Sequence, residues 1–128
     1  MPTLTPQHLE QYDRDGYTLL ESLFTPNECD AVMAHYMAVH AGKMRYDGVA
    51  TREPDDWGRW INPHLWGDEV ALKLLIEPRL RQPLKECLGD EPDGVQTMYF
   101  YEGSQQGYHQ DQYYGPGVMA VWIALVDV

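Results

Sequence analysis

The chain has 128 residues, 44% of them hydrophobic, including four tryptophans and nine tyrosines. This length and composition indicate one globular domain that can bury a core, and they exclude a disordered tail. Nine Lys and Arg against twenty Asp and Glu give a formal net charge of -11, so the chain lacks the basic surface that nucleic acid or an anionic membrane would require.

The amino terminus shows no sign of a targeting or membrane segment. It has neither a positively charged start nor the apolar core of a signal peptide, and no run of about 18 apolar residues occurs anywhere. We therefore expect a cytoplasmic protein with no membrane partner.

Two helices are predicted near the start of the chain. Thr5 followed by Pro6 is a favourable helix start, and Gly16 would end that helix. Residues 17–21 then resemble a short strand. The segment 25–28 (Thr-Pro-Asn-Glu) is a capping box that opens a second, amphipathic helix, which we expect to end at Gly42 and to serve as a packing element.

Residues 43–67 lack periodicity and contain Trp57, Trp60 and Trp66. Long irregular stretches in compact domains are often lids or pocket walls. The alternative is that these tryptophans simply cover the core. Both interpretations stay open on the sequence alone.

A helical pattern returns over residues 68–88, with breaks expected near Pro78 and Pro83 and an end at Gly89. From Val95 onward the residues alternate as in β-strands. Residues 118–126 are apolar on both faces, which predicts a strand covered on each side.

Cys29 and Cys87 are far apart, without CxxC spacing, and each lies in an apolar segment with a helical pattern. Buried thiols are expected, rather than a disulfide or a nucleophile.

The segment 108–111 (Tyr-His-Gln-Asp) carries the most specific chemistry. Residues i and i+2 of a strand point to the same face, so His109 and Asp111 can converge on one metal ion. One imidazole and one carboxylate are two members of the facial triad of non-haem Fe(II) oxygenases, which leaves coordination positions open. No histidine follows His109 to complete the triad.

Three segments together resemble the phytanoyl-CoA dioxygenase-like proteins, a family of Fe(II)- and 2-oxoglutarate-dependent oxygenases. They are 96–101 (Gln-Thr-Met-Tyr-Phe-Tyr), 108–114 (Tyr-His-Gln-Asp-Gln-Tyr-Tyr) and 121–125 (Val-Trp-Ile-Ala-Leu). The Gly16-Tyr17 pair and the capped second helix agree with the family as well. The resemblance covers nearly the whole chain but only about the first half of a family domain.

The resemblance implies an α+β fold, in which amino-terminal helices support the first strands of a double-stranded β-helix, a jelly-roll or cupin-like barrel. It implies His109 and Asp111 as metal ligands, with Gln96 and Trp122 lining the pocket of the co-substrate 2-oxoglutarate. No separate acid, base or nucleophile is assigned. Related halogenases carry a small residue at the position of Asp111, so the carboxylate favours hydroxylation.

The chain also departs from the family pattern. Relatives often have a lysine where Glu102 stands, and the family's distal histidine and co-substrate arginine belong to later strands. We therefore expect 1–128 to be a single, apparently truncated oxygenase domain, with helical support and a Trp-rich loop over 1–92 and core strands over 93–128. Without those two groups the isolated chain should be inactive unless complemented.

Two alternatives to a complete enzyme stay open. The chain is either a remnant that pairs through its exposed last strand, forming a homo-oligomer or binding a separate carboxy-terminal chain, or a jelly-roll binding module without redox chemistry. The substrate class is a small molecule of unspecified identity. The other histidines are expected on the surface or in helices, and none of them matches a metal-ligand position of the family. They are His8, His35, His40 and His64.

Overall fold

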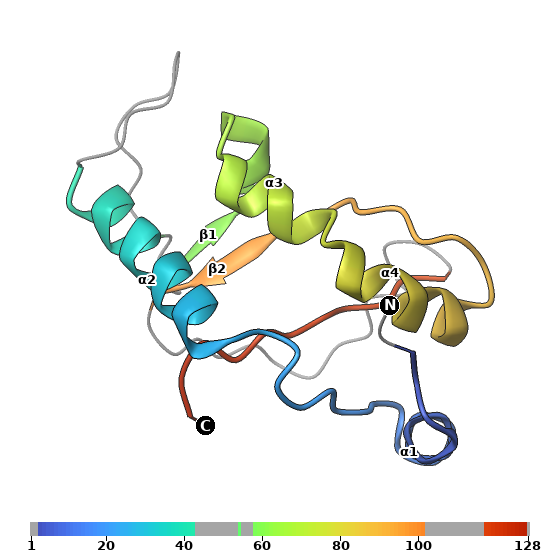
Figure 1. Ribbon diagram of the computed structural model, residues 1–128. Coiled ribbons are helices and arrows are strands. Elements are labelled where there is room, and N and C mark those ends of the chain that lie inside the picture. The colour runs from blue at the N-terminus through green and yellow to red at the C-terminus, as the bar shows by residue number, and fades with distance from the viewer. Residues whose placement is uncertain (1–2, 43–53, 55–57, 102–116, 128) are drawn as a thin grey trace.

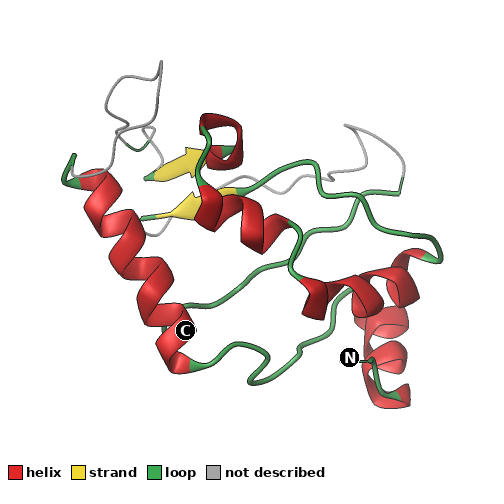
Figure 2. Cartoon of the chain, turned by 45° about the horizontal axis from the view of Figure 1, so that its top comes forward, coloured by secondary structure: helices red, strands yellow, loops and turns green. Residues whose placement is uncertain are grey.

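The structure is a computed structural model that describes residues 3–42, 54, 58–101 and 117–127. Helices dominate, and a small antiparallel sheet lies beside the second of them (Figures 1 and 2). In chain order the elements are α1 (Pro6–Asp15), α2 (Pro26–His40), β1 (Arg59–Ile61), the 3-10 helix η1 (Pro63–Trp66), α3 (Glu69–Leu75), α4 (Pro78–Leu88) and β2 (Met98–Phe100). This content confirms the α+β class, while the β-helix barrel is not seen among these residues.

The predicted start and end of α1 are confirmed. Thr5 is the N-cap, its hydroxyl accepts a hydrogen bond from the His8 amide (3.3 Å), and the His8 ring Nδ1 accepts one from the Thr5 amide (3.1 Å). Gly16 ends the helix with a φ of 80°, a conformation that costs glycine little. A histidine therefore completes a capping box in which Glu or Gln is usual.

The capping box of α2 is also confirmed. The Thr25 amide donates to Glu28 Oε2 (2.7 Å), and the Glu28 amide donates to the Thr25 hydroxyl (3.2 Å). The helix ends at His40, two residues before the predicted Gly42. Its buried side chains are Tyr36 and Val39, so α2 is the packing element that the sequence indicated.

The strand predicted over residues 17–21 is wrong. This segment forms no ladder with any other described residue, and the Tyr17 and Leu19 side chains are exposed. Its alternating pattern is compatible with an extended chain, but a strand also needs a neighbour that accepts its backbone hydrogen bonds.

Part of the region predicted to be irregular is ordered. Arg59–Ile61 forms β1 and Pro63–Trp66 forms η1, whereas Trp57 lies outside the described residues. Trp60 is 1% exposed, and Trp66 packs against the same core. For these two tryptophans the core interpretation is therefore confirmed.

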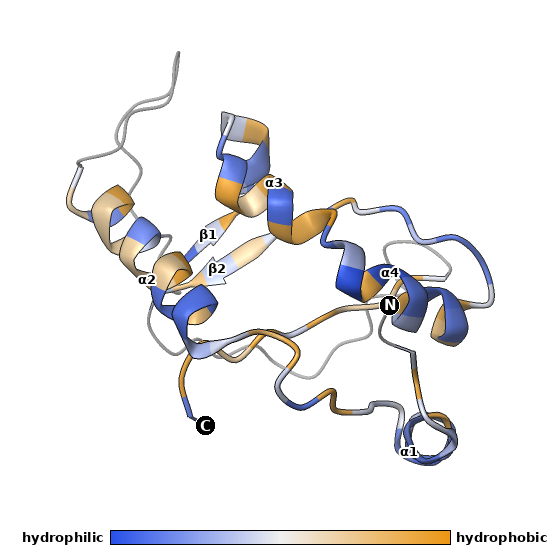
Figure 3. Ribbon diagram, in the orientation of Figure 1, coloured by the Kyte–Doolittle hydropathy of each residue, from blue (hydrophilic) through white to orange (hydrophobic). Residues whose placement is uncertain are grey.

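The break before Pro78 is confirmed, since α3 ends at Leu75 and α4 begins at Pro78. The break near Pro83 is wrong, because α4 runs through that residue to Leu88. Proline removes one helical hydrogen bond, but the Pro83 ring is buried, so packing offsets part of that cost. Gly89 ends the helix as predicted. In Figure 3 most of the α4 ribbon carries the colour of hydrophilic residues.

The sheet joins two segments that are far apart in sequence. β1 and β2 pair antiparallel, with Arg59 opposite Phe100, Trp60 opposite Tyr99 and Ile61 opposite Met98. A backbone hydrogen bond from Asn62 to the Thr97 carbonyl (2.7 Å) extends the pairing by one residue.

The core lies between this sheet and α2. Tyr36, Val39 and Trp60 form its buried centre. The Tyr36 and Tyr99 rings stack with centroids 4.0 Å apart, which fastens β2 to the helix.

The covered strand predicted over 118–126 is wrong within the described segment 117–127. This segment forms no ladder with described residues, and most of its side chains are exposed. The apolar pattern predicts covering layers on both faces, whereas among the described residues Trp122 stacks on Phe100 and still remains mostly exposed. Among the described residues no helix is long and apolar enough to cross a membrane.

Candidate functional site

The two predicted metal ligands, His109 and Asp111, lie outside the described residues. Their convergence from one strand therefore stays a prediction. Within the described ranges, no group of three or more His, Cys, Asp and Glu side chains could hold a metal ion.

The sheet that precedes the His-x-Asp segment has two distinct faces. Side chains alternate along a strand, and residues directly opposite each other on paired strands share a face. Trp60 and Tyr99 face the core and α2. The other face, which we call the outer sheet face, carries Arg59, Ile61, Met98 and Phe100.

Trp122 lies against the outer sheet face. Its ring stacks on Phe100 with centroids 5.0 Å apart and an interplanar angle of 13°. The residue was expected on a strand, which is wrong for the described segment. Its predicted part in lining the co-substrate pocket stays a prediction. Figure 1 shows the carboxy-terminal segment running from the side of α4 towards the start of α2.

Gln96 was expected on the strand before the metal ligands. It lies two residues before β2 begins, and its side chain is exposed. Its placement inside a strand is therefore wrong. Its predicted part in co-substrate binding stays a prediction.

Thr97, the neighbour of Gln96, is held by two side chains. Its amide donates to Asn62 Oδ1 (3.2 Å), and its hydroxyl lies 2.7 Å from His64 Nδ1. Asn62 has a φ of 54°, a left-handed conformation that asparagine tolerates better than most residues. His64 therefore joins η1 to the start of β2. The sequence showed only that His64 lies in the Trp-rich segment.

A buried polar cluster joins α2 to the start of α3, and sequence reasoning missed it. Asp68 is 1% exposed, accepts a 2.7 Å hydrogen bond from the Tyr36 hydroxyl and lies 2.7 Å from His35 Nε2. Asp68 is also the N-cap of α3. The sequence signal for it was a helix start, which gave no indication of partners on α2.

The remaining sequence candidates occupy structural positions. His40 stacks on Tyr101 with centroids 4.4 Å apart. Cys29 and Cys87 are free thiols that are half-buried rather than fully buried. Burial raises the pKa of the Cys87 thiol, and the nearby Glu86 adds to this rise, so the thiolate is disfavoured.

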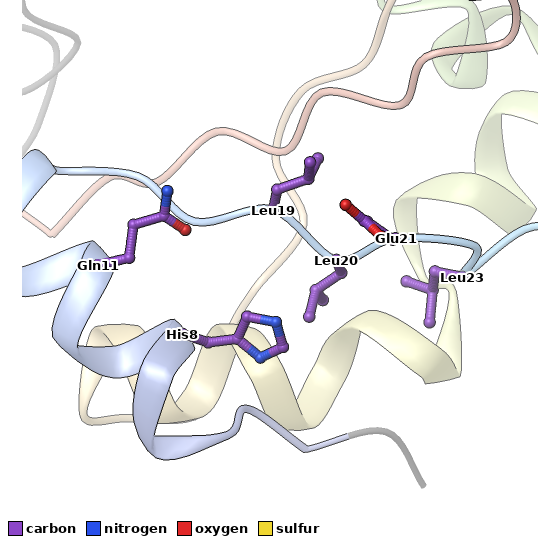
Figure 4. Close-up of a pocket in the computed structure, with 6 residues that line it drawn as sticks. All are labelled: His8, Gln11, Leu19, Leu20, Glu21 and Leu23. Atoms are coloured by element: carbon purple, nitrogen blue, oxygen red, sulfur yellow. The ribbon is translucent and has the colours of Figure 1, made fainter.

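A separate pocket of about 560 Å³ opens between α1 and the segment that follows it (Figure 4). His8 and Gln11 of α1 face Leu19, Leu20, Glu21 and Leu23 across it. None of the predicted site residues lines this pocket.

The comparison with known families decides the classification. The model of the phytanoyl-CoA dioxygenase (PhyH) family matches residues 12–128. The chain belongs to the phytanoyl-CoA dioxygenase family. Phytanoyl-CoA dioxygenase family members are in general Fe(II)- and 2-oxoglutarate-dependent, which assigns this chain to the oxygenases at family level. No curated protein and no solved structure gave a match.

Proposed function

We propose that this chain is a hydroxylating Fe(II)- and 2-oxoglutarate-dependent oxygenase in which His109 and Asp111 hold the iron. The observation that carries the proposal is the family match over residues 12–128, since this range includes the His-x-Asp segment. The donor chemistry fits, because an imidazole and a carboxylate are the ligand types of non-haem Fe(II) centres. When bound, iron and 2-oxoglutarate supply the oxidising chemistry, and the protein supplies position and protection.

In this proposal β2 forms part of a double-stranded β-helix, supported by the helices that precede it. The core side of β2 is fixed by the stack of Tyr99 on Tyr36. The other side then faces the reaction pocket. Trp122, backed by Phe100, shields the pocket from water, and the Gln96 amide donates hydrogen bonds to the co-substrate.

The facial triad requires a second histidine, and four of the five histidines occupy structural positions: His8, His35, His40 and His64. The proposal therefore includes a contribution from beyond these residues. A further segment, a second copy of the chain or a separate carboxy-terminal chain would supply the missing ligand and the cation that pairs with 2-oxoglutarate.

Metal titration tests the two ligands directly. Co(II), added anaerobically in place of Fe(II), should bind the chain with visible ligand-field bands. We expect His109→Ala and Asp111→Ala each to weaken binding about tenfold or more. His8→Gln is the matched control, because glutamine preserves the capping box of α1 while removing an imidazole. Equal binding by wild type and both ligand variants would refute the assignment.

A second candidate function is a binding module that kept the pocket and lost redox chemistry. The exposure of Trp122 favours it, since 76% of an aromatic residue is left accessible beside a sheet. Tight binding of an apolar ligand by metal-free protein, together with no Co(II) binding at His109, would support this candidate over the oxygenase.

A further inference from the structure

The pocket between α1 and the segment that follows it is large enough for a small organic ligand. Its volume of about 560 Å³ lies within the range of roughly 300–1,000 Å³ that small-molecule sites occupy. None of the residues assigned to iron or to 2-oxoglutarate lines it. The lining combines three apolar and three polar side chains, which are Leu19, Leu20, Leu23, His8, Gln11 and Glu21 (Figure 4).

Hydrogen bonds hold both walls of this pocket in place. The Thr18 hydroxyl donates to Gln11 Oε1 (3.0 Å), which ties the segment after α1 to the helix. The Leu4 amide donates to Glu86 Oε2 (2.8 Å) and so fixes the start of α1 to α4. A ligand therefore meets walls that are already positioned, which lowers the entropic cost of binding.

His8 contributes one hydrogen-bond donor to the pocket. Its Nδ1 accepts a hydrogen bond from the Thr5 amide (3.1 Å), so the proton of the neutral imidazole lies on Nε2. Within the part of the chain that the structure describes, Nε2 has no hydrogen-bond partner. Figure 4 shows the ring projecting from α1 towards Leu20. The pocket thus offers an oriented N–H group to a ligand atom that accepts a hydrogen bond.

Glu21 contributes a carboxylate to the opposite wall. This side chain is exposed and forms no ion pair with another described residue. Arg14, Arg79, Arg81 and Lys85 already pair with other carboxylates. The net charge of -11 also attracts cations to the protein as a whole. The charge at this pocket therefore favours a positively charged ligand.

We propose that this pocket binds an organic cation that carries an apolar body and a carbonyl group. The ammonium group pairs with Glu21, the carbonyl oxygen accepts a hydrogen bond from His8 Nε2, and the apolar body packs against the three leucines. The inference goes beyond the proposed oxygenase function, because it assigns a ligand site to α1 and the segment after it.

Equilibrium dialysis of metal-free protein with three matched probes tests this assignment. N-(4-aminobutyl)benzamide carries the ammonium group, the carbonyl and an aromatic body. N-Butylbenzamide lacks only the amine, and 6-phenylhexylamine has methylene groups in place of the amide. Wild-type protein should bind the first probe about fivefold more tightly than either of the others, since an exposed ion pair and a single hydrogen bond each contribute on that order.

Variants assign each preference to one side chain. Glu21→Gln should abolish the preference for the amine over N-butylbenzamide, whereas Glu10→Gln removes an exposed carboxylate of α1 outside the pocket and should preserve it. His8→Glu keeps the capping box, in which glutamate is usual, and removes the donor. The added charge acts on both cationic probes, so the ratio of their affinities isolates the carbonyl contact. We expect His8→Glu to bind these two probes equally.

The apolar wall has its own variant, because Leu19→Gln at an exposed position should weaken all three probes. Far-ultraviolet circular dichroism verifies that each variant is folded. Equal affinity of wild type for the three probes, or unchanged preferences in both Glu21→Gln and His8→Glu, would overturn the inference. Affinity that falls as protein concentration rises would also overturn it, by showing that a second copy occupies the pocket. Co(II) binding by His109 and Asp111 is measured separately, so failure here leaves the oxygenase assignment standing.

Discussion

The Tyr36 hydroxyl and the Asp68 carboxylate are joined by a 2.7 Å hydrogen bond that links α2 to the start of α3 beneath the core. Asp68 is almost completely buried. If the Tyr36 hydroxyl is removed, the Asp68 carboxylate oxygen that it contacted loses this hydrogen bond, and water reaches that oxygen poorly. Tyr36→Phe keeps the ring stack on Tyr99 and removes only this donor. We expect it to lower the free energy of unfolding by about 1–3 kcal/mol.

Urea denaturation followed by circular dichroism measures this loss. Tyr17→Phe is the matched control, because Tyr17 is exposed and should change stability little. If the two variants were equally stable, the bond between Tyr36 and Asp68 would contribute nothing to folding.

Trp60 and Trp122 should respond in opposite ways to truncation. Trp60 is 1% exposed within the core, so Trp60→Ala should cost about 3–5 kcal/mol of stability. Trp122 is 76% exposed, so Trp122→Ala should cost much less and affect ligand binding instead. Thermal unfolding of both variants distinguishes the core residue from the surface residue, and a similar loss in both would contradict the assignment.

Thr25 should contribute to the stability of the protein only through its hydrogen bond at the N-cap of α2. Its hydroxyl accepts from the Glu28 amide at the start of α2, so Thr25→Ala should destabilise the protein by about 1 kcal/mol. Thr25→Ser retains the acceptor and should recover most of this loss. Chemical denaturation of the pair provides the measurement, and a serine variant as unstable as the alanine variant would contradict the capping role.

The Glu28–Arg79 pair should make stability depend on pH in the acid range. Hydrogen bonds from Arg79, and then from the Thr25 amide, lower the pKa of Glu28 from 4.5 to about 2. A lowered folded-state pKa gives stability that is complete above the unfolded value and is lost as pH falls through the folded value. The melting temperature should therefore decline between pH 4.5 and pH 2 partly through Glu28.

Glu28→Gln should flatten that part of the pH profile, and Arg79→Gln should flatten it too. Because the ion pair is accessible to solvent, salt should weaken the effect. The two substitutions share one interaction, so their effects on the melting temperature should not add. Additive effects would show that the two side chains act separately.

Association through the carboxy-terminal segment can be tested by removing one of its backbone hydrogen-bond donors. Residues 118–126 form no ladder with described residues, so edge pairing with another chain would use their backbone donors. Val121→Pro removes one such donor without altering the Trp122 ring. Sedimentation velocity should show wild type associating as its concentration rises and the variant associating less. Identical profiles would contradict pairing through this segment.

The sequence alone determined the features that depend on neighbours in the chain. Thr5, Thr25, Gly16 and Gly89 mark helix ends because a cap is made within three or four residues, where spacing is visible in the letters. The family resemblance and the His-x-Asp segment were likewise apparent from local order, and the family match confirmed the resemblance.

The tertiary structure decided everything that needs a distant partner. An alternating pattern shows which side chains share a face but does not show whether another strand lies beside them. Residues 17–21 and 118–126 were therefore wrongly predicted as strands, whereas Arg59–Ile61 became one by pairing with Met98–Phe100. The burial of Asp68 beneath Tyr36 and the stack of Trp122 on Phe100 depend in the same way on contacts between residues far apart in sequence, which local patterns do not specify.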